Sequence, residues 1–270
     1  MRPLNFIALL LIITGLAVLP CRAEEHVISR GETCLQIAID HDLTMEQLQR
    51  LNPGIDLEMM LIGDRLIVPD EGVSFEDYIA RRYAEVLQVT ESSCEITADG
   101  AALCLLFTEN ISESPLFDVR VSVSVRGQNG YSAQSEADIP LMQILPGEKL
   151  PMSVVIPGNF DTAENVMIRA DSLTVSDKLQ SSFRISEAHY TQKDSFSPDR
   201  VSGTSVIEFT AEGISAYSGK KINVLSAAYD DENNLIGVRS LYTDFYPRLD
   251  ITTYTNNRPI EFIQLRLEAY

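Results

Sequence analysis

The chain has 270 residues, a formal net charge of −18 and no tryptophan. Such an excess of carboxylates repels nucleic acid and anionic membranes, because both are negatively charged. Binding of a neutral ligand, such as an uncharged glycan, is compatible with this charge. The length is sufficient for two or three domains.

The N-terminus predicts a secretory signal peptide over residues 1–23. Arg2 supplies a positive charge, residues 6–19 form a continuous apolar run, and Ala23 suits the position before a cleavage site. This run is too short for a comfortable membrane span, and no later run approaches the length of about 18 apolar residues that a span needs. We therefore expect the mature protein to be secreted, and to be extracellular or associated with the cell wall. It would be held at a membrane only if the signal segment were retained or if Cys21 were lipidated, and both alternatives stay open.

The next segment predicts a strand, two helices and a second strand. A short β-type run at residues 26–29 meets an Arg-Gly turn, and Thr33 and Thr44 each open a helical pattern. Residues 52–54, Asn-Pro-Gly, end the second helix because proline and glycine disfavour its continuation. A turn and a closing strand follow at residues 61–69. Leu35, Ala38 and Ile39 share one face of the first helix, and Met45, Leu48 and Leu51 share one face of the second. The residues that we expect in the core are Ile28, Leu35, Ile37, Ala38, Leu48, Leu51, Leu66 and Val68.

This segment resembles a LysM module, a small βααβ fold that binds N-acetylglucosamine-containing glycans. The matching residues are Gly31, Glu32, Thr33, Ile37, Ala38, Leu48, Leu51, Asn52, Pro53, Ile55, Ile62, Gly63, Leu66 and Pro69. Glu32 stands where the family usually has Asp, and Asp64 stands where Gln is frequent. We assign residues 24–70 to this domain.

The resemblance implies a shallow glycan-binding groove between two loops. The residues that it assigns to this groove are Gly31, Glu32, Thr33, Cys34 and Leu35 in the first loop, and Asn52, Pro53, Gly54, Ile55, Asp56, Leu57, Ile62 and Gly63 in the second. Gly31 lets the backbone approach the sugar, while Ile55 and Ile62 would supply apolar contact. The expected partner is peptidoglycan or a chitin-type glycan.

Residues 71–93 are expected to form a linker and a helix. Residues 70–74 are short, polar and contain a glycine, as linkers often do. Apolar residues then recur at three- and four-residue steps, which predicts an amphipathic helix over residues 75–87. These apolar residues are Phe75, Ile79, Tyr83 and Val86.

From about Val89 onward, short β-type runs alternate with turns. Four valines of the run 116–125 alternate with polar residues, which indicates a strand with one buried face. A looser second copy begins near Ser182, and segments 119–130 and 222–234 both read as an alternating strand followed by a polar hairpin. The expected strands include Leu116–Val125, Leu150–Ile156, Val166–Ala170, Phe183–Tyr190, Val201–Thr210, Ile222–Tyr229, Leu235–Leu241 and Ile260–Ala269.

Both copies resemble the FxLYD-type, immunoglobulin-like β-sandwich domains of bacterial envelope proteins. The matching features are Asn110, the 116–125 strand, Asn129-Gly130 and Pro146-Gly147-Glu148 in the first copy, and Gly203, the 222–230 strand and Gly237-Val238 in the second. The resemblance implies sandwiches over residues 94–180 and 181–270 that act as spacer or adhesion modules toward other envelope proteins. The expected fold is multidomain: a small α+β LysM domain followed by two all-β immunoglobulin-like domains.

Cys94 and Cys104 are expected to form a disulfide, since a secreted protein meets an oxidising environment. A three-residue loop at residues 98–100 would place them directly opposite each other in a hairpin, within bonding reach. A two-residue turn would offset them by one residue, and a pair of buried reduced thiols is the alternative. Cys34 is left over, either as a small core or groove residue or as a reactive thiol at a helix N-terminus.

The sequence predicts no cofactor, no metal site and no catalytic residues. Its three histidines, His26, His41 and His189, lack the clustered partners that a zinc peptidase needs. The favoured function is therefore a secreted, non-catalytic envelope protein that binds glycan through a single LysM. The alternatives are an envelope assembly or protein-interaction factor that does not bind glycan, and a cryptic cell-wall hydrolase, because a glycosidase needs only two carboxylates.

Overall fold

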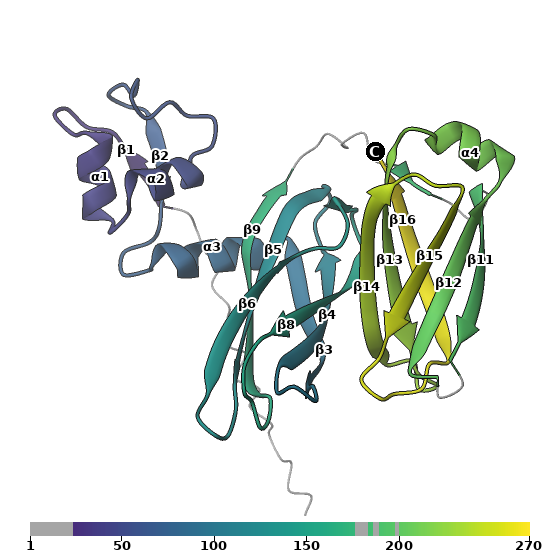
Figure 1. Ribbon diagram of the computed structural model, residues 1–270. Helices are drawn as coiled ribbons and strands as arrows, with labels where there is room; N and C mark the ends of the chain where they lie inside the picture. The colour runs from purple at the N-terminus through teal and green to yellow at the C-terminus, as the bar shows by residue number, and fades with distance from the viewer. Residues whose placement is uncertain (1–23, 176–182, 186–188, 198–199) are drawn as a thin grey trace, which may run out of the picture. The chain divides into compact units, whose positions relative to one another are not determined.

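The computed structural model describes residues 24–175, 183–185, 189–197 and 200–270. The expected signal peptide, Cys21 and the expected boundary after residue 180 lie outside the described residues. The chain separates into two compact units, and the division falls between Tyr78 and Ile79 (Figure 1). Among the described helices, none is long and apolar enough to cross a membrane.

The first unit has the strand–helix–helix–strand order that the sequence predicts. Its elements are β1 (Glu24–Val27), α1 (Cys34–Asp40), α2 (Met45–Leu51) and β2 (Arg65–Val68). The two strands pair antiparallel, with Glu24 opposite Val68 and Val27 opposite Arg65. Both strands and both helices are short, and the small α+β fold expected for this region is confirmed.

Threonine caps fix where both helices of the first unit begin. The Thr33 hydroxyl accepts a hydrogen bond from the Gln36 amide at 3.2 Å. Thr44 and Gln47 form a reciprocal capping box, in which each side chain accepts a hydrogen bond from the other residue's amide. Such a cap stabilises a helix by about 1 kcal/mol, because it pairs an amide that the helix itself leaves free. The two threonines that the sequence identified as helix starts are confirmed.

The buried face of α1 is displaced by one position along the sequence from the expected apolar face. Leu35 and Ile39 are each 57% exposed, so the prediction that Leu35 belongs to the core is wrong, whereas Ile37 is buried as expected. The buried residues of α1 are Cys34, Ile37 and Ala38. This set has the same three- and four-residue spacing as the expected one, but it starts one position earlier, and spacing alone does not fix the starting position. In α2, Leu48 and Leu51 are buried as expected, whereas Met45 is partly exposed.

A third helix follows the first unit's closing strand. This helix, α3 (Phe75–Ala84), begins where the Ser74 hydroxyl accepts a hydrogen bond from an amide of its first turn. Tyr78 is its most buried side chain. The linker and helix expected over residues 71–93 end earlier than predicted, because the first strand of the next unit already begins at Leu87.

In the second unit, β3 to β9 form a sandwich of two sheets. One sheet has the order β3 (Leu87–Ile96), β4 (Ala102–Asn110) and β8 (Lys149–Ile156). In the other, β5 (Leu116–Arg126) pairs along one edge with β9 (Glu164–Val175) and along the opposite edge with β6 (Ser132–Asp138) and β7 (Gln143–Ile144). The four alternating valines of β5 are buried, as the sequence predicts.

A second sandwich repeats this strand order. One sheet contains β11 (Tyr190–Phe196), β12 (Ser202–Phe209) and β15 (Arg248–Tyr254), and the other contains β10 (Phe183–Arg184), β16 (Phe262–Ala269), β13 (Lys221–Tyr229) and β14 (Leu235–Asp244). The order β11-β12-β15 matches β3-β4-β8, and β14-β13-β16 matches β6-β5-β9. A short helix, α4 (Ala211–Tyr217), connects β12 to β13. The fold class, a small α+β region followed by a mainly β region with several sheets, is confirmed.

Most expected strands coincide with observed ones, with several differences. The single strand expected at residues 183–190 is wrong, because β10 and β11 are separate and belong to different sheets. The strand β6 was not predicted, because its only apolar residues are the small Ala133 and Ala137. The strands β7 and β15 and the helix α4 were not predicted either.

The β3–β4 hairpin has the expected register. Cys94 lies opposite Cys104, and the two are joined by a disulfide. The Thr97 amide donates to the Ala101 carbonyl at 2.9 Å, and Gly100 has a φ of +86°, which is the left-handed conformation that a three-residue loop needs. The disulfide and its three-residue loop are therefore confirmed. The two-residue turn and the reduced thiols are wrong.

The two sandwiches share an apolar junction. Leu225 of β13 is fully buried in the hydrophobic core of the first sandwich. Leu105 of β4 forms a second cluster with residues of the other sandwich. Those residues are Ala227, Tyr229 and Leu235. Side chains of both sandwiches thus pack together in two apolar clusters where the sandwiches meet.

Polar contacts flank this junction. The Arg184 guanidinium lies 2.7 Å from the Glu148 carboxylate of the first sandwich and 3.2 Å from Glu268, whose side chain is completely buried. On another part of the junction, the Asn256 amide donates to the Glu95 carboxylate at 3.0 Å. These bonds fix the orientation in which the apolar surfaces meet.

Candidate functional site

Two loops of the first unit are joined by backbone hydrogen bonds. The first loop, residues 28–33, connects β1 to α1, and the second, residues 52–64, connects α2 to β2. The Ile28 amide donates to the Asp64 carbonyl at 2.9 Å, and the Gly63 amide donates to the Ile28 carbonyl at 2.8 Å. The two loops that the sequence assigned to one groove are therefore neighbours in space.

A carboxylate inside the first loop holds its shape. The Glu32 carboxylate accepts a hydrogen bond from the Ser29 amide at 2.7 Å and lies 3.1 Å from the His26 Nε2. The Ser29 hydrogen bond, followed by the His26 contact, lowers the pKa of Glu32. Gly31 has a φ of +94°, which residues with a Cβ rarely adopt. Glu32 therefore acts on the loop backbone, while Gly31 allows the loop to turn.

A buried amide holds the second loop to the body of the unit. The Asn52 Nδ2 donates to the carbonyls of Leu48 and Ile67 at 2.9 and 3.0 Å, and its Oδ1 accepts from the Ile67 amide at 2.7 Å. All of its polar atoms are thus paired with backbone, as a buried amide requires. Asn52 joins the end of α2 to β2, and its side chain is not free to meet a ligand.

Two aspartates shape the exposed part of the second loop. The Asp56 carboxylate accepts from the Glu58 amide at 3.0 Å, and the Asp64 carboxylate accepts from the Leu61 amide at 2.8 Å. In addition, the Gln49 side chain donates to the Ile55 carbonyl at 2.8 Å. These side chains replace the regular backbone pairing that a loop lacks, so the loop has a defined shape without a ligand.

Three large apolar side chains of the second loop are exposed. Met59, Leu61 and Ile62 are 75%, 70% and 69% exposed, respectively. Because the loop is fixed by hydrogen bonds, these side chains do not turn inward to the core. A concentration of exposed apolar side chains in one short segment is characteristic of a binding surface. Of these three residues, only Ile62 was predicted to lie in the groove. The run of apolar residues between the Pro-Gly turn and Gly63 could have identified Met59 and Leu61 as well.

The structure divides the expected groove residues into an exposed set and a buried set. The exposed or partly exposed residues are Gly31, Glu32, Thr33, Leu35, Pro53, Gly54, Ile55, Asp56, Ile62 and Gly63. The buried residues are Cys34, Asn52 and Leu57. The latter three lie beneath the loops, and their contribution to a site is to support its shape.

Cys34 is a free thiol at the start of α1, and it is buried. Burial raises the pKa of this thiol, because the thiolate would lose its hydration. The structure therefore supports the core role that the sequence analysis considered for Cys34, rather than the reactive thiol.

The side chains that could bind a metal or act in catalysis do not cluster in the described residues. Among the residues that the structure describes, no three or more His, Cys, Asp or Glu side chains come together as a metal would require. The His26 and His41 rings meet edge to face at 5.9 Å, and the His189 ring meets Tyr217 in the same way at 5.7 Å. These are packing contacts between rings.

The joined loops, the capped helices and the short antiparallel strand pair agree with one known family. Residues 26–69 match the family model of the LysM domain. The chain therefore contains a LysM domain at its N-terminal end. LysM is a binding domain for N-acetylglucosamine-containing glycans and is not itself catalytic. The match does not extend into the second unit.

Over the whole chain, the resemblance to two solved structures is too weak to indicate a function. No curated protein matches the chain significantly. Among solved structures, the chain is similar to one described as pT26-6p, with a TM-score of 0.21, 8% identity, and coverage of 71% of this chain and 67% of the other. It is also similar to the tandem CBM22-1–CBM22-2 domain of Paenibacillus barcinonensis Xyn10C, with a TM-score of 0.19, 10% identity, and coverage of 64% and 71%. TM-scores this low support no conclusion about fold or ligand.

Proposed function

We propose that this chain is a secreted, non-catalytic protein of the cell envelope that binds peptidoglycan or a chitin-type glycan through its LysM domain. The observation that carries the proposal is the exposed apolar group of Met59, Leu61 and Ile62 on a loop that is hydrogen-bonded to the Gly31 loop. A fixed apolar surface beside accessible backbone suits a sugar with an acetamido group, which presents both a methyl group and an amide.

The exposed loop residues have distinct roles in this proposal. The side chain of Ile62, with its two apolar neighbours, covers the carbon faces of the sugar. Gly31, Gly54 and Gly63 let backbone amides and carbonyls reach the acetamido group, since they have no side chain to block it. Glu32 holds the first loop in the receptive shape through its bond to Ser29. No ion pair is needed, so the affinity should change little with salt.

The second unit supports an extracellular location. A disulfide between Cys94 and Cys104 forms and persists in oxidising compartments, which the expected signal peptide would provide. We further propose that the sandwiches are of the FxLYD-like, immunoglobulin-like type and act as spacer or adhesion modules toward other envelope proteins. Their matching strand order supports a duplicated module.

The test is a titration of the full chain with chitin oligomers and with soluble peptidoglycan fragments. The variant Ile62→Asp should reduce the affinity by about tenfold or more, because it removes an apolar contact and introduces a charge that must be desolvated. Ile39→Asp is the matched control, because Ile39 is also an exposed isoleucine of the same domain but lies on α1. It should bind as the unmodified chain does.

Two results would decide against this function. If neither glycan produces heat or NMR shifts at millimolar concentration, the domain does not bind sugar, and a protein-interaction role becomes the better proposal. If suspensions of cell walls lose turbidity on addition of the chain, the protein is a hydrolase.

A further inference from the structure

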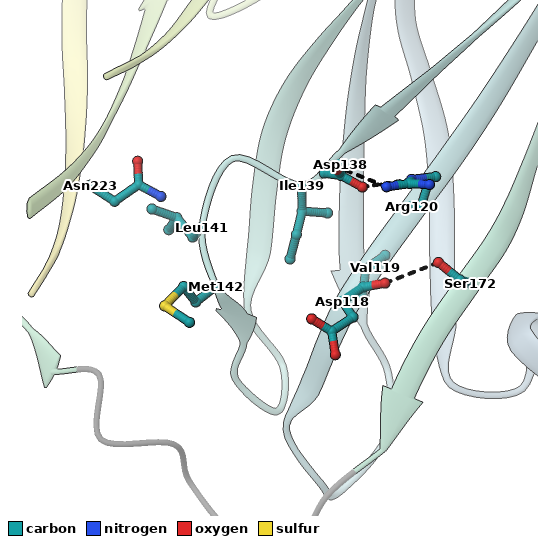
Figure 2. A pocket seen from close by; sticks show the side chains of 9 residues that line it. All are labelled: Asp118, Val119, Arg120, Asp138, Ile139, Leu141, Met142, Ser172 and Asn223. Carbon is teal, nitrogen blue, oxygen red and sulfur yellow. Dashed lines mark hydrogen bonds and ion pairs between the residues drawn. The ribbon is translucent and has the colours of Figure 1, made fainter. Parts of the chain in front are cut away.

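The second unit contains a pocket between its two sandwiches. Its volume is about 420 Å³, within the range of roughly 300–1,000 Å³ that small-molecule sites occupy. Asp118, Arg120, Asp138 and Met142 of the first sandwich line it, together with Asn223 of the second (Figure 2). Both sandwiches therefore contribute to this pocket.

Hydrogen bonds across the junction fix this pocket. The Asn223 side chain donates to the Pro140 carbonyl, and the Met142 amide donates to the Glu268 carboxylate at 2.8 Å. Each bond joins one sandwich to the other. A ligand would thus meet a preformed site and would not need to order it, which lowers the entropic cost of binding.

An aromatic surface adjoins the pocket on the second sandwich. Asn223 of β13 lies directly opposite Tyr242 of β14, so the two side chains share one face of the sheet. Tyr242 is 61% exposed, and its ring stacks with that of Tyr270 at a centroid distance of 5.8 Å and an angle of 24°. Burial is the main cause that raises the pKa of Tyr270 to about 12, so this ring is neutral at physiological pH.

Two cations around this surface are paired with carboxylates. The Lys221 ammonium lies over the Tyr242 ring, 5.9 Å from its centroid, and forms an ion pair with Asp244. In the pocket, the Arg120 Nε donates to the Asp138 carboxylate at 2.7 Å. A phosphate or another anion would have to compete with these carboxylates for the two cations. A neutral polyhydroxyl ligand can bond to donors and acceptors of both pairs without separating them.

We propose that the exposed Tyr242–Tyr270 stack and the adjoining pocket form a second saccharide-binding surface. A pyranose ring would lie against the exposed part of the Tyr242 ring, while its hydroxyl or acetamido substituents would enter the pocket toward the Arg120–Asp138 pair. The aromatic face suits the carbon face of a sugar, and the paired polar groups suit its substituents.

The choice of N-acetylglucosamine-containing glycan as the ligand rests on the function proposed for the LysM domain. Two sites on one chain would bind the same polymer together. Once one site is occupied, the other meets the polymer at a raised effective concentration, so overall affinity exceeds that of either site.

The experiment uses the full chain and chitin hexasaccharide, followed by NMR of isotope-labelled tyrosines. The Ile62→Asp variant weakens the LysM site, so that any remaining binding reports on the second surface. Tyr242→Ala then removes the proposed stacking face. Tyr254→Ala is the matched control, because Tyr254 is a 70% exposed tyrosine on the other sheet of the same sandwich.

In the Ile62→Asp chain, the hexasaccharide should still shift the signals of Tyr242 and Tyr270. With an intact LysM domain, Tyr242→Ala should reduce the affinity for polymeric chitin by about tenfold, whereas Tyr254→Ala should leave it unchanged. Unshifted signals of these two tyrosines at millimolar sugar would overturn the proposal, as would equal effects of the two tyrosine variants. If Ile62→Asp leaves the affinity unchanged while Tyr242 still shifts, the LysM function fails and the second surface stands.

Discussion

The two compact units of this chain use apolar side chains in opposite ways. In the LysM domain, hydrogen bonds hold the loops, and Met59, Leu61 and Ile62 remain exposed. In the second unit, Leu105 and Leu225 are buried where the two sandwiches meet. The comparison separates two functions of hydrophobic surface: an exposed group on a fixed loop is available for a ligand, while a buried one joins domains into a single unit.

The variant Leu225→Ala should produce the largest change. Leu225 belongs to β13 but is buried in the core of the first sandwich, so its truncation leaves a cavity at the junction. We expect the free energy of unfolding of the second unit to fall by about 2–5 kcal/mol. Urea denaturation followed by circular dichroism measures this loss. In contrast, Leu48→Ala in the LysM core should leave the transition of the second unit unchanged. If Leu225→Ala lowers the stability of one sandwich only, the two sandwiches fold separately.

Replacing both cysteines of the β3–β4 hairpin by serine should have the next largest effect. The disulfide closes a short loop, and its removal should cost the second unit about 3 kcal/mol by the chain-entropy estimate. Thermal unfolding with and without a reducing agent provides the comparison. The reductant should lower the melting temperature of the natural chain and leave the double serine variant unchanged. Equal sensitivity of both proteins would contradict the prediction.

A smaller loss is expected in the LysM domain for Asn52→Ala. This change leaves the buried carbonyls of Leu48 and Ile67 and the Ile67 amide without their partner. We expect a loss of about 2 kcal/mol, since unpaired buried polar groups keep their desolvation cost. Thr33→Ala is a comparison within the same domain, because it removes one helix cap and should cost about 1 kcal/mol. Hydrogen exchange of the Ile67 amide should accelerate in the Asn52 variant. An unchanged exchange rate would show that Asn52 does not hold the loop.

The smallest expected effect is the response of the first loop to acid. The lowered pKa of Glu32 means that the folded loop favours the carboxylate over the acid. Its stabilisation is therefore complete above the usual Glu value of 4.5 and is lost as the pH falls through the lower folded value. Hydrogen exchange of the Ser29 amide, corrected for intrinsic rates, should become less protected below that pH. Glu32→Gln should abolish this pH dependence, and an unaltered dependence would assign it to another group.

The LysM domain could be predicted from the sequence because its signals are local. Helix starts at Thr33 and Thr44 and the Asn-Pro-Gly stop each act within a few residues. The orientation of α1 was not predictable in this way. Leu35 and Ile39 look like a core pair by spacing, but their exposure depends on how the helix meets the rest of the domain. The pairing of Asn52 with Ile67 likewise joins residues that are distant in the sequence.

The second unit was only partly predictable. Alternating valines identify β5, and the loop with Gly100 fixes the register of the disulfide hairpin. The strand β6 alternates in burial, but the apolar residues on its inner face are only the small Ala133 and Ala137, so its sequence pattern is too weak to identify a strand. The junction contacts of Leu225 and Arg184 cannot be read from a single sequence, since they depend on how two separately recognisable sandwiches meet.

The exposed edge of strand β6 affects how copies of this protein can pack against one another. In the described residues β6 pairs with β5 alone, so its other edge presents free backbone groups to which a strand of another molecule could add. Two carboxylates of this strand, Glu136 and Asp138, share the single guanidinium of Arg120 on β5, so the edge keeps a net negative charge that would repel the same edge of another copy. Copies of the protein gathered densely on one polymer would therefore resist strand-to-strand aggregation. The predominantly polar composition that makes β6 hard to predict from the sequence also keeps neighbouring copies apart.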